Sequence, residues 1–219
     1  MKTIYYYYVR HGETVFNLEN RIVINGSIET RMQGITDSPL TCKGIEQIAQ
    51  TTEALRNEFF NSAYTSPLPR TIQTAEIILE PHNMHAKIFE PLREFSYGSW
   101  DGHIKNESDP EYQYRFSNDL FDDLGGENPT MVRQRIQNAF RELHGFSCDQ
   151  DRILLVSHGA YFRHLLFSLM KDNIPNELLH RECLIGNGGI AVFKDVDGSF
   201  SLVEGPLSQA EYINRHVKD

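Results

Sequence analysis

The chain has 219 residues, of which 40% are hydrophobic and 23% are charged, and its formal net charge is −9. This length and composition predict one globular α/β domain over residues 1–219. The negative charge disfavours nucleic acid and anionic membrane surfaces as partners, and no segment reaches the ~20 apolar residues that span a bilayer. The three scattered cysteines are typical of a reducing compartment, so we expect a cytoplasmic protein.

Strand and helix patterns alternate along the chain. β-prone apolar runs predict strands at residues 3–9, 63–65, 87–89 and 152–156, and helical spacing predicts helices at residues 41–59, 69–80, 129–144 and 160–170. Two further β-prone runs, residues 190–195 and 200–204, flank a hairpin turn at residues 196–199. The alternation predicts a three-layer α/β sandwich with a mostly parallel central sheet, helices on both faces and an antiparallel addition near the C-terminus.

Local signals mark some of the helix ends. Thr41 is a plausible N-cap, Pro129 stands at an early helical position, and Gly145 lies just beyond the expected end of the third helix. Residues 96–128, in contrast, are rich in Gly, Asp, Asn and Tyr and lack clear periodicity. We interpret them as an excursion that covers the sheet edge or a site.

Two histidines directly follow predicted strands. His11 comes after the first strand and His158 after residues 152–156, and each precedes a glycine. Sheets of this kind bind ligands at the carboxyl ends of their strands, so both side chains can project into one crevice. One imidazole could attack phosphorus there while the other stabilises the developing charge.

Arginines accompany these histidines. Arg10 precedes His11, and its planar guanidinium matches the oxygens of a phosphate. Arg70 lies in the first turn of a predicted helix, where free amides and the helix dipole attract anions. Because the net charge is negative, a phosphate site has to concentrate positive charge locally in this way.

Five ordered blocks make the chain resemble the histidine phosphatase superfamily, also called the phosphoglycerate mutase-like family, over residues 3 to about 195. The blocks are Arg10–Glu13 with Thr14 and Asn17, Arg31–Thr41, Ser66–Ala75, Leu92–Gly102 and Ser157–Gly159. Gly159 after the second histidine and the few cysteines resemble the first, intracellular branch. The second branch, of acid phosphatases and phytases, pairs that histidine with an aspartate.

The resemblance implies a role for each matching residue. His11 becomes phosphohistidine, and Glu94 gives a proton to the leaving group and then serves as the base. Arg10, Arg70 and His158 bind the phosphoryl oxygens, and the substrate-binding residues are Asn17, Gln33, Gly34, Tyr97, Lys105 and Gly159. We expect no metal and no cofactor. The physics agrees, because attack requires neutral His11, which cationic neighbours favour, and Glu94 needs burial or acidic neighbours to hold its proton near neutral pH.

The resemblance leaves two reactions open for a small phosphorylated substrate. Mutases of the family have a lysine where this chain has Lys105, and a later pair of adjacent arginines that residues 106–128 lack. That segment is acidic instead, with Glu107, Asp109, Glu111, Asp119, Asp122, Asp123 and Glu127. We therefore expect a phosphomonoester phosphatase, with phosphoglycerate mutase as the alternative.

Other possibilities stay open at this point. The segment between Asn17 and Gln33 is several residues longer than is usual in the family, and it either shapes substrate access or is a surface extension. A metal enzyme using both histidines and a carboxylate is disfavoured by the neighbouring arginines, which repel a cation. An inactive binding module is disfavoured because both histidines, both arginines and Glu94 are retained. The substrate and the oligomeric state are not specified.

Overall fold

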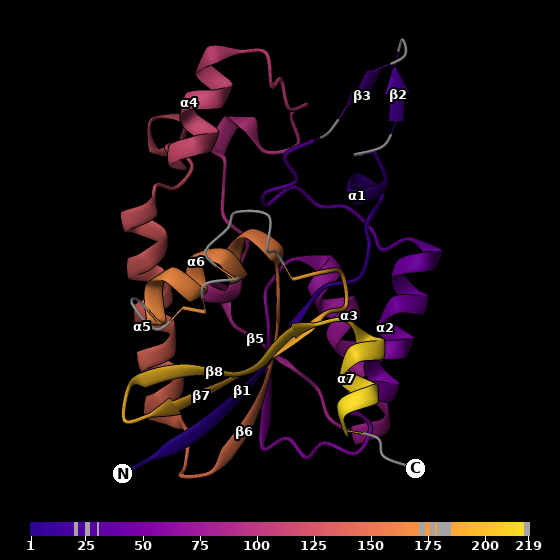
Figure 1. Ribbon diagram of the computed structural model, residues 1–219, viewed down its shortest axis with the longest axis vertical. Coiled ribbons are helices and arrows are strands. Elements are labelled where there is room, and N and C mark those ends of the chain that lie inside the picture. The colour runs from indigo at the N-terminus through magenta and orange to yellow at the C-terminus, as the bar shows by residue number, and fades with distance from the viewer. Residues whose placement is uncertain are drawn as a thin grey trace.

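The computed structural model describes residues 1–19, 22–24, 27–29, 31–170, 174–175, 178 and 185–216. Within this part of the chain, the main sheet consists, in spatial order, of β5 (Lys87–Ile88), β4 (Ser62–Thr65), β6 (Asp151–Ser157), β1 (Thr3–Arg10), β7 (Ile190–Val196) and β8 (Ser199–Leu207) (Figure 1). The first four strands run parallel, whereas β7 and β8 are antiparallel to their neighbours. The predicted sheet with its antiparallel C-terminal addition is therefore confirmed.

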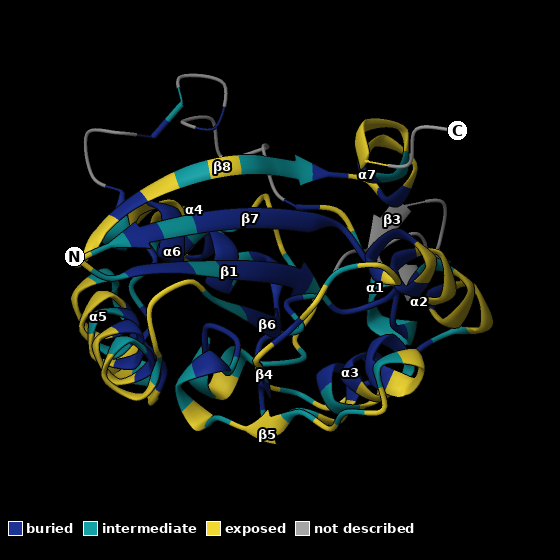
Figure 2. Ribbon diagram, turned by 90° about the horizontal axis from the view of Figure 1, so that it is seen from below, coloured by how far each residue is buried: buried dark blue, intermediate teal, exposed yellow. Residues whose placement is uncertain are grey.

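Helices cover both faces of this sheet. On one face α2 (Cys42–Leu55), α3 (Pro69–Leu79) and α7 (Gln209–His216) pack against Tyr7 and Val9 of β1. On the other face α5 (Pro129–Phe146) and α6 (Gly159–Leu169) pack against Tyr6 and Tyr8. The tyrosine-rich first strand is thus buried on both faces. Figure 2 shows buried central strands between helices whose exposed residues face away from the sheet. The predicted three-layer sandwich is confirmed.

The strand register brings the two predicted histidines together. Arg10 pairs with Ser157 across the parallel β1–β6 ladder, so His11 and His158 leave the sheet at the same level. The His11 amide donates to the Ser157 carbonyl at 3.1 Å. On the other side of β6, the Ser66 amide donates to the Val156 carbonyl at 3.0 Å. The carboxyl edge of three adjacent strands therefore forms the floor of one site.

Local signals explain several element boundaries. The Thr41 side chain accepts the Gly44 amide at 2.9 Å, so its predicted N-cap role is confirmed. The predicted hairpin turn is also confirmed, with Asp197 (φ 49°) and Gly198 (φ 87°) in the left-handed conformations that a tight turn requires. The expected end of the third helix before Gly145 was wrong, because α5 continues to Phe146 and the Ser147 amide still bonds to Leu143.

The segments that lacked periodicity contain further structure. α4 (Pro110–Asn118) lies within the 96–128 excursion, and the Asp109 side chain caps it by accepting the Glu111 amide. Before the block at Arg31–Thr41, α1 (Val15–Glu19) precedes an antiparallel pair, β2 (Ile22–Ile24) and β3 (Ser27–Glu29). Figure 1 shows α4 and the β2–β3 pair standing above the sheet. The rest of the longer segment after Asn17 lies outside the described residues.

Candidate active site

His11 is buried at the end of β1, with 2% of its surface exposed. Its Nδ1 lies 2.8 Å from the Gly12 carbonyl oxygen. A carbonyl can only accept, so Nδ1 carries the proton and Nε2 keeps a free lone pair. Burial, reinforced by Arg70 and Arg10, lowers the pKa of His11 well below its usual 6.5. The ring is therefore neutral at pH 7 and nucleophilic at Nε2.

Two buried arginines flank this histidine. Arg10 donates through Nη1 to the Ile185 carbonyl at 2.8 Å. Arg70, which is 1% exposed, donates to the carbonyls of Thr36 and Gly34 at 2.9 and 2.8 Å. Burial lowers the pKa of Arg70 to about 10, so it remains charged at neutral pH. The Nε atoms of both arginines are buried and have no hydrogen-bond partner.

His158 lies beside His11, with ring centroids 5.2 Å apart. Its backbone is fixed by Tyr8, whose hydroxyl donates to the His158 carbonyl at 2.6 Å and accepts its amide at 3.0 Å. Its Nε2 lies 2.7 Å from Ser66 Oγ, whereas its Nδ1 is buried without a partner. Burial, followed by Arg70 and His11, lowers the pKa of His158 well below 6.5, so this ring is also neutral.

Glu94 is 8% exposed, and its side chain contacts the first turn of α6. Its Oε1 accepts the amides of Phe95 at 2.9 Å and Tyr161 at 2.7 Å, and its Oε2 accepts the Ala160 amide at 3.2 Å. Burial raises the pKa of Glu94 above 4.5 even though these amides favour the charged form. A carboxyl group whose pKa is raised in this way can act as a proton donor.

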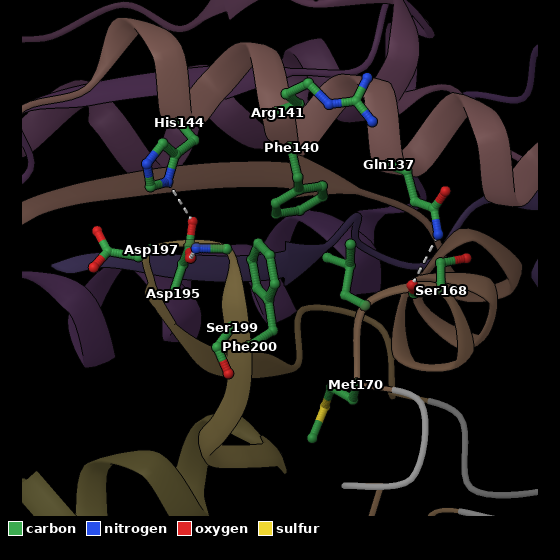
Figure 3. Close-up of a pocket in the computed structure, with 12 residues that line it drawn as sticks. Gln137, Phe140, Arg141, His144, Ser168, Met170, Asp195, Asp197, Ser199 and Phe200 are labelled. Atoms are coloured by element: carbon green, nitrogen blue, oxygen red, sulfur yellow. Dashed lines mark hydrogen bonds and ion pairs between the residues drawn. The ribbon is translucent and has the colours of Figure 1, made fainter. Parts of the chain in front are cut away.

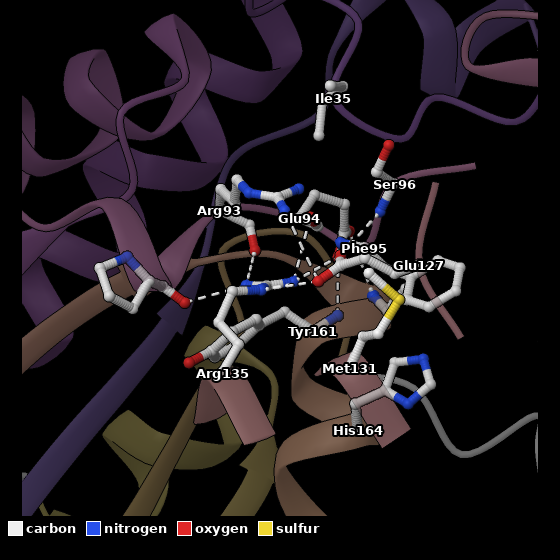
Figure 4. A network of polar contacts seen from close by, with 12 residues as sticks. Ile35, Arg93, Glu94, Phe95, Ser96, Glu127, Met131, Arg135, Tyr161 and His164 are labelled. Atoms are coloured by element: carbon white, nitrogen blue, oxygen red, sulfur yellow. Dashed lines mark hydrogen bonds and ion pairs between the residues drawn. The ribbon is translucent and has the colours of Figure 1, made fainter. Parts of the chain in front are cut away.

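A network of charged groups holds the segment that carries Glu94 (Figure 4). Arg135 of α5 donates to the carbonyls of Pro91 and Arg93 at 2.9 and 2.8 Å. The same guanidinium binds both carboxylate oxygens of Glu127 at 2.8 and 2.7 Å. Glu127 in turn accepts the Ser96 amide at 3.1 Å. The bidentate Arg135–Glu127 ion pair and its hydrogen bonds to the backbone therefore hold residues 91–96 in place.

A cavity of about 470 Å³ opens over these groups. Of the predicted site residues, it is lined by Arg10, His11, Asn17, Gln33, Gly34, Glu94, Tyr97, Lys105 and Gly159. Arg70 and His158 lie behind that lining, fully buried, next to Gly34 and His11 respectively. All of the predicted site residues thus come together, although they are contributed by segments far apart in the sequence.

The polar wall of the cavity is a chain of amides. Asn17 Oδ1 accepts the Thr14 amide at 3.0 Å and Asn187 Nδ2 at 3.2 Å, while Asn17 Nδ2 donates to Gln33 at 3.4 Å. Asn187 also donates to the His11 carbonyl at 3.0 Å. Gly34 has a φ of +51°, and a Cβ there would overlap the Asp101 carboxylate, so only glycine fits this close approach.

Sequence reasoning missed several lining residues: Arg31, Met32, Phe116, Asp119, Ala160 and Arg163. Arg163 could have been found, because it follows Gly159 by four positions on α6 and therefore shares its face. Its guanidinium pairs with Asp119 at 2.6 Å. The Asp109-Pro110 capping signal could have indicated α4, the helix that carries Phe116, but not that Phe116 faces the cavity. No sequence pattern indicated that Asn187 lies near the site.

Several carboxylates of the 96–128 excursion form ion pairs with arginines. Asp119 lines the cavity, but it faces Arg163. Glu127 is bound by Arg135, and Asp123 and Glu111 both bind Arg115. Four of the seven carboxylates of residues 106–128 are therefore paired with arginines.

A second, larger cavity of about 610 Å³ lies between α5, the end of α6 and the β7–β8 hairpin (Figure 3). Phe140 and Phe200 form part of its lining. Four of its polar residues form two pairs: His144 Nδ1 lies 2.8 Å from Asp195, and Gln137 donates to the Ser168 carbonyl at 3.5 Å. This cavity contains none of the predicted site residues.

Two other features are absent from the described residues. No group of three or more His, Cys, Asp or Glu side chains there is arranged to hold a metal ion. No described helix has the length and apolar character needed to cross a membrane.

The comparisons with known proteins agree with this geometry. The family model of the histidine phosphatase superfamily (branch 1) matches residues 6–204. A curated protein of Enterobacter sp. (strain 638), named "Probable phosphoglycerate mutase GpmB", is 35% identical over 169 residues, covering 75% of this chain and 74% of that protein. The chain therefore belongs to branch 1 of the histidine phosphatase superfamily, whose members are phosphatases and mutases that act through phosphohistidine.

Solved structures share the fold. Phosphoglycerate mutase from Bacillus anthracis str. Sterne superimposes with a TM-score of 0.77 at 22% identity, covering 98% of this chain and 96% of that chain. Phosphoserine phosphatase from Entamoeba histolytica, in complex with 3-phosphoglyceric acid, gives a TM-score of 0.71 at 26% identity, covering 92% and 95%. Both a mutase and a phosphatase are thus among its structural neighbours.

Proposed function

We propose that this chain is a phosphomonoester phosphatase that acts on a small phosphorylated metabolite through a phosphohistidine at His11. The observation that carries the proposal is the set of buried polar atoms without partners around His11, namely Arg10 Nε, Arg70 Nε and His158 Nδ1. A buried polar group without a partner costs ~1–3 kcal/mol, so three such atoms together indicate a site built to receive a polar ligand, and the two arginine donors among them favour an anion. We also propose that residues 1–219 form one domain of this kind in the cytoplasm.

The first half-reaction transfers the phosphoryl group to the enzyme. The His11 Nε2 lone pair attacks phosphorus while the bond between phosphorus and the leaving oxygen breaks. Glu94 gives its proton to that oxygen, so a neutral alcohol leaves and Glu94 becomes a carboxylate. Arg10, Arg70 and His158 face the phosphoryl oxygens, where the negative charge of the transition state is spread.

The second half-reaction returns the enzyme to its starting state. A water molecule attacks the phosphorus of phosphohistidine, and the Glu94 carboxylate takes its proton. The P–N bond breaks, the electron pair returns to His11 Nε2, and inorganic phosphate leaves. The amide donors to Glu94 from Tyr161 and Ala160 stabilise its charged form during the interval between the two steps.

The position of Arg115, which is bound by two carboxylates outside the cavity, favours hydrolysis over mutase chemistry. It is the one arginine of residues 106–128, and Asp123 holds it at 2.5 Å while Glu111 holds it at 2.9 Å. It does not line the cavity. The segment that carries paired arginines in mutases therefore supplies none to the substrate. Phosphoglycerate mutase remains the second candidate, because Lys105 lines the cavity and the relative from Enterobacter sp. carries that name.

A substrate panel tests the proposal. Inorganic phosphate release from a set of metabolite monoesters is measured beside interconversion of 2- and 3-phosphoglycerate. We expect phosphate release that needs no bisphosphate primer, whereas rapid interconversion with negligible release would identify a mutase. His11→Ala should abolish turnover and phosphoenzyme formation, and His85→Ala, at an exposed histidine, should change neither. More than a few per cent activity in His11→Ala would contradict the mechanism.

Leaving groups of different basicity test the role of Glu94. Glu94→Gln removes the transferable proton, so turnover of an alkyl phosphate should fall by ~100- to 10,000-fold. A nitrophenyl phosphate leaves as a stabilised phenolate and needs little protonation, so its first step should fall much less. Equal losses for both substrates would mean that Glu94 acts by another route.

A further inference from the structure

Ser66 is in contact with the second histidine but has no role in the mechanism so far. It follows β4 directly and precedes α3, and both Ser66 and His158 are fully buried. Ser66 Oγ lies 2.7 Å from His158 Nε2. The Leu68 amide donates to the same oxygen at 3.3 Å. The hydroxyl is thus held between a backbone donor and an imidazole nitrogen.

The direction of the Ser66–His158 hydrogen bond follows from counting donors and acceptors. One lone pair of Ser66 Oγ accepts the Leu68 amide, so the hydroxyl hydrogen still needs an acceptor. Among the described residues, the acceptor within hydrogen-bonding distance is His158 Nε2. If Nε2 accepts, the neutral ring carries its proton on Nδ1. His158 Nδ1 is the nitrogen that is buried without a partner.

We propose that Ser66 is a positioning residue that sets the tautomer of His158, so that His158 Nδ1–H donates to the phosphoryl group during transfer. The inference rests on the proposed function for its phosphoryl ligand, but not for the tautomer itself. Arg10 Nε and Arg70 Nε also lack partners, and neither bonds to His158 Nδ1. A lone pair on Nδ1 would attract these N–H groups, whereas an N–H on Nδ1 makes all three groups donors for one anion.

The wrong tautomer has a clear chemical cost. With the proton on Nε2, Nδ1 would direct a lone pair at the negatively charged phosphoryl oxygens, and one stabilising donor would become a repulsive group. Below its pKa the ring has an N–H at both nitrogens, and the tautomer no longer matters. The titratable groups that influence His158 most are Arg70, His11, Arg10 and Arg135. These groups are common to wild type and a Ser66 variant, so their effects cancel in an activity ratio.

The experiment combines nitrogen NMR with kinetics. In protein labelled with ¹⁵N-histidine, with the His158 signals assigned by comparison with His158→Gln, each ring nitrogen reports whether it carries a proton. We expect Nδ1–H in wild type and in Ser66→Thr, which keeps the hydroxyl, and a shift toward Nε2–H in Ser66→Ala. The matched control is Ser168→Ala, because Ser168 is also buried and donates to a backbone carbonyl, that of His164.

The kinetic arm uses the same variants. We expect kcat/KM to fall ~10- to 100-fold in Ser66→Ala, as for other residues that orient a functional histidine, with Ser66→Thr and Ser168→Ala close to wild type. The deficit of Ser66→Ala should narrow as the pH falls through the His158 pKa. A wild-type spectrum with Nε2–H would overturn the proposal even if Ser66→Ala fails to fold, and so would a pH-independent deficit. Absence of turnover in wild type would reject the proposed function but leave the tautomer measurement valid.

Discussion

The Arg135–Glu127 ion pair supports the segment that carries Glu94, and its removal tests how much this pair contributes to stability and to catalysis. Arg135→Met keeps the stem of the side chain but removes four short hydrogen bonds, two to the Glu127 carboxylate and two to the carbonyls of Pro91 and Arg93. The Glu127 side chain is 5% exposed, so its charge would remain buried. Removing one partner of a buried pair costs ~3–5 kcal/mol. Arg93 stays 3.5 Å from Glu127 and compensates in part, which favours the lower end of that range.

Urea unfolding measures the loss of free energy, and thermal unfolding measures the accompanying change in Tm. A loss of ~3 kcal/mol corresponds to a fall in Tm of ~6–12 °C for a chain of this size. Arg133→Met is the matched control, because Arg133 is an exposed residue of α5, and it should stay within ~0.5 kcal/mol of wild type. Adding Glu127→Gln to Arg135→Met removes the stranded charge yet keeps an acceptor for the Ser96 amide. The double variant should therefore be more stable than Arg135→Met alone.

The same variants test whether the ion pair positions Glu94. Arg135→Met should lower kcat on an alkyl phosphate ~10-fold, because the segment bearing the proton donor loses its support, with a smaller effect on an aryl phosphate. Two results would refute the reasoning: an Arg135→Met protein within 1 kcal/mol of wild type, or a double variant whose losses simply add.

Three further predictions concern groups close to the phosphoryl site. Arg70→Lys keeps the charge but loses the planar fork, so kcat/KM should fall ~10- to 1,000-fold, and near-normal kinetics would contradict its placement in the site. Gly159→Ala places a methyl group 3.2 Å from Arg10 Cζ and Nε, so the guanidinium must shift and we expect a raised KM for phosphate monoesters. The control is Gly145→Ala, which should leave the kinetics unchanged because the added Cβ has no neighbour within 4 Å. Because the pKa of His11 is lowered, its ring stays neutral and nucleophilic as the pH falls through 6.5. The acid limb of the kcat/KM profile should therefore have its midpoint well below 6.5. A midpoint at or above 6.5 would contradict the conclusion that burial lowers this pKa.

Much of the site was predictable because its central signals are local. A strand that ends in Arg10-His11 and another that ends before His158 each place a histidine at a carboxyl edge, and a parallel register then brings the two rings together. Arg70 was predictable in the same way, from a strand followed by a proline at the start of a helix. These inferences needed no knowledge of side-chain contacts.

The outer parts of the site depend on contacts that no local pattern records. Asn187 reaches His11 because the Gly188 amide bonds to the Arg10 carbonyl at 3.0 Å, a contact between residues far apart in the chain. Tyr112 is the one buried residue of α4, so the helix has almost no apolar periodicity to detect. Sequence alone also does not show that Asp119 faces Arg163.

The parallel β1–β6 pair has a consequence for how the molecule moves. Its strands lie at the centre of the sheet with apolar side chains packed on both faces, so the amides of residues 8–11 and 155–158 should exchange hydrogen only when the whole domain unfolds. α4 has a single buried residue and should exchange far sooner through local opening. The spacing of the two imidazoles is thus protected by the most slowly exchanging part of the chain. We therefore expect that the α4 side of the cavity, which Phe116 lines, can be redesigned without disturbing that spacing.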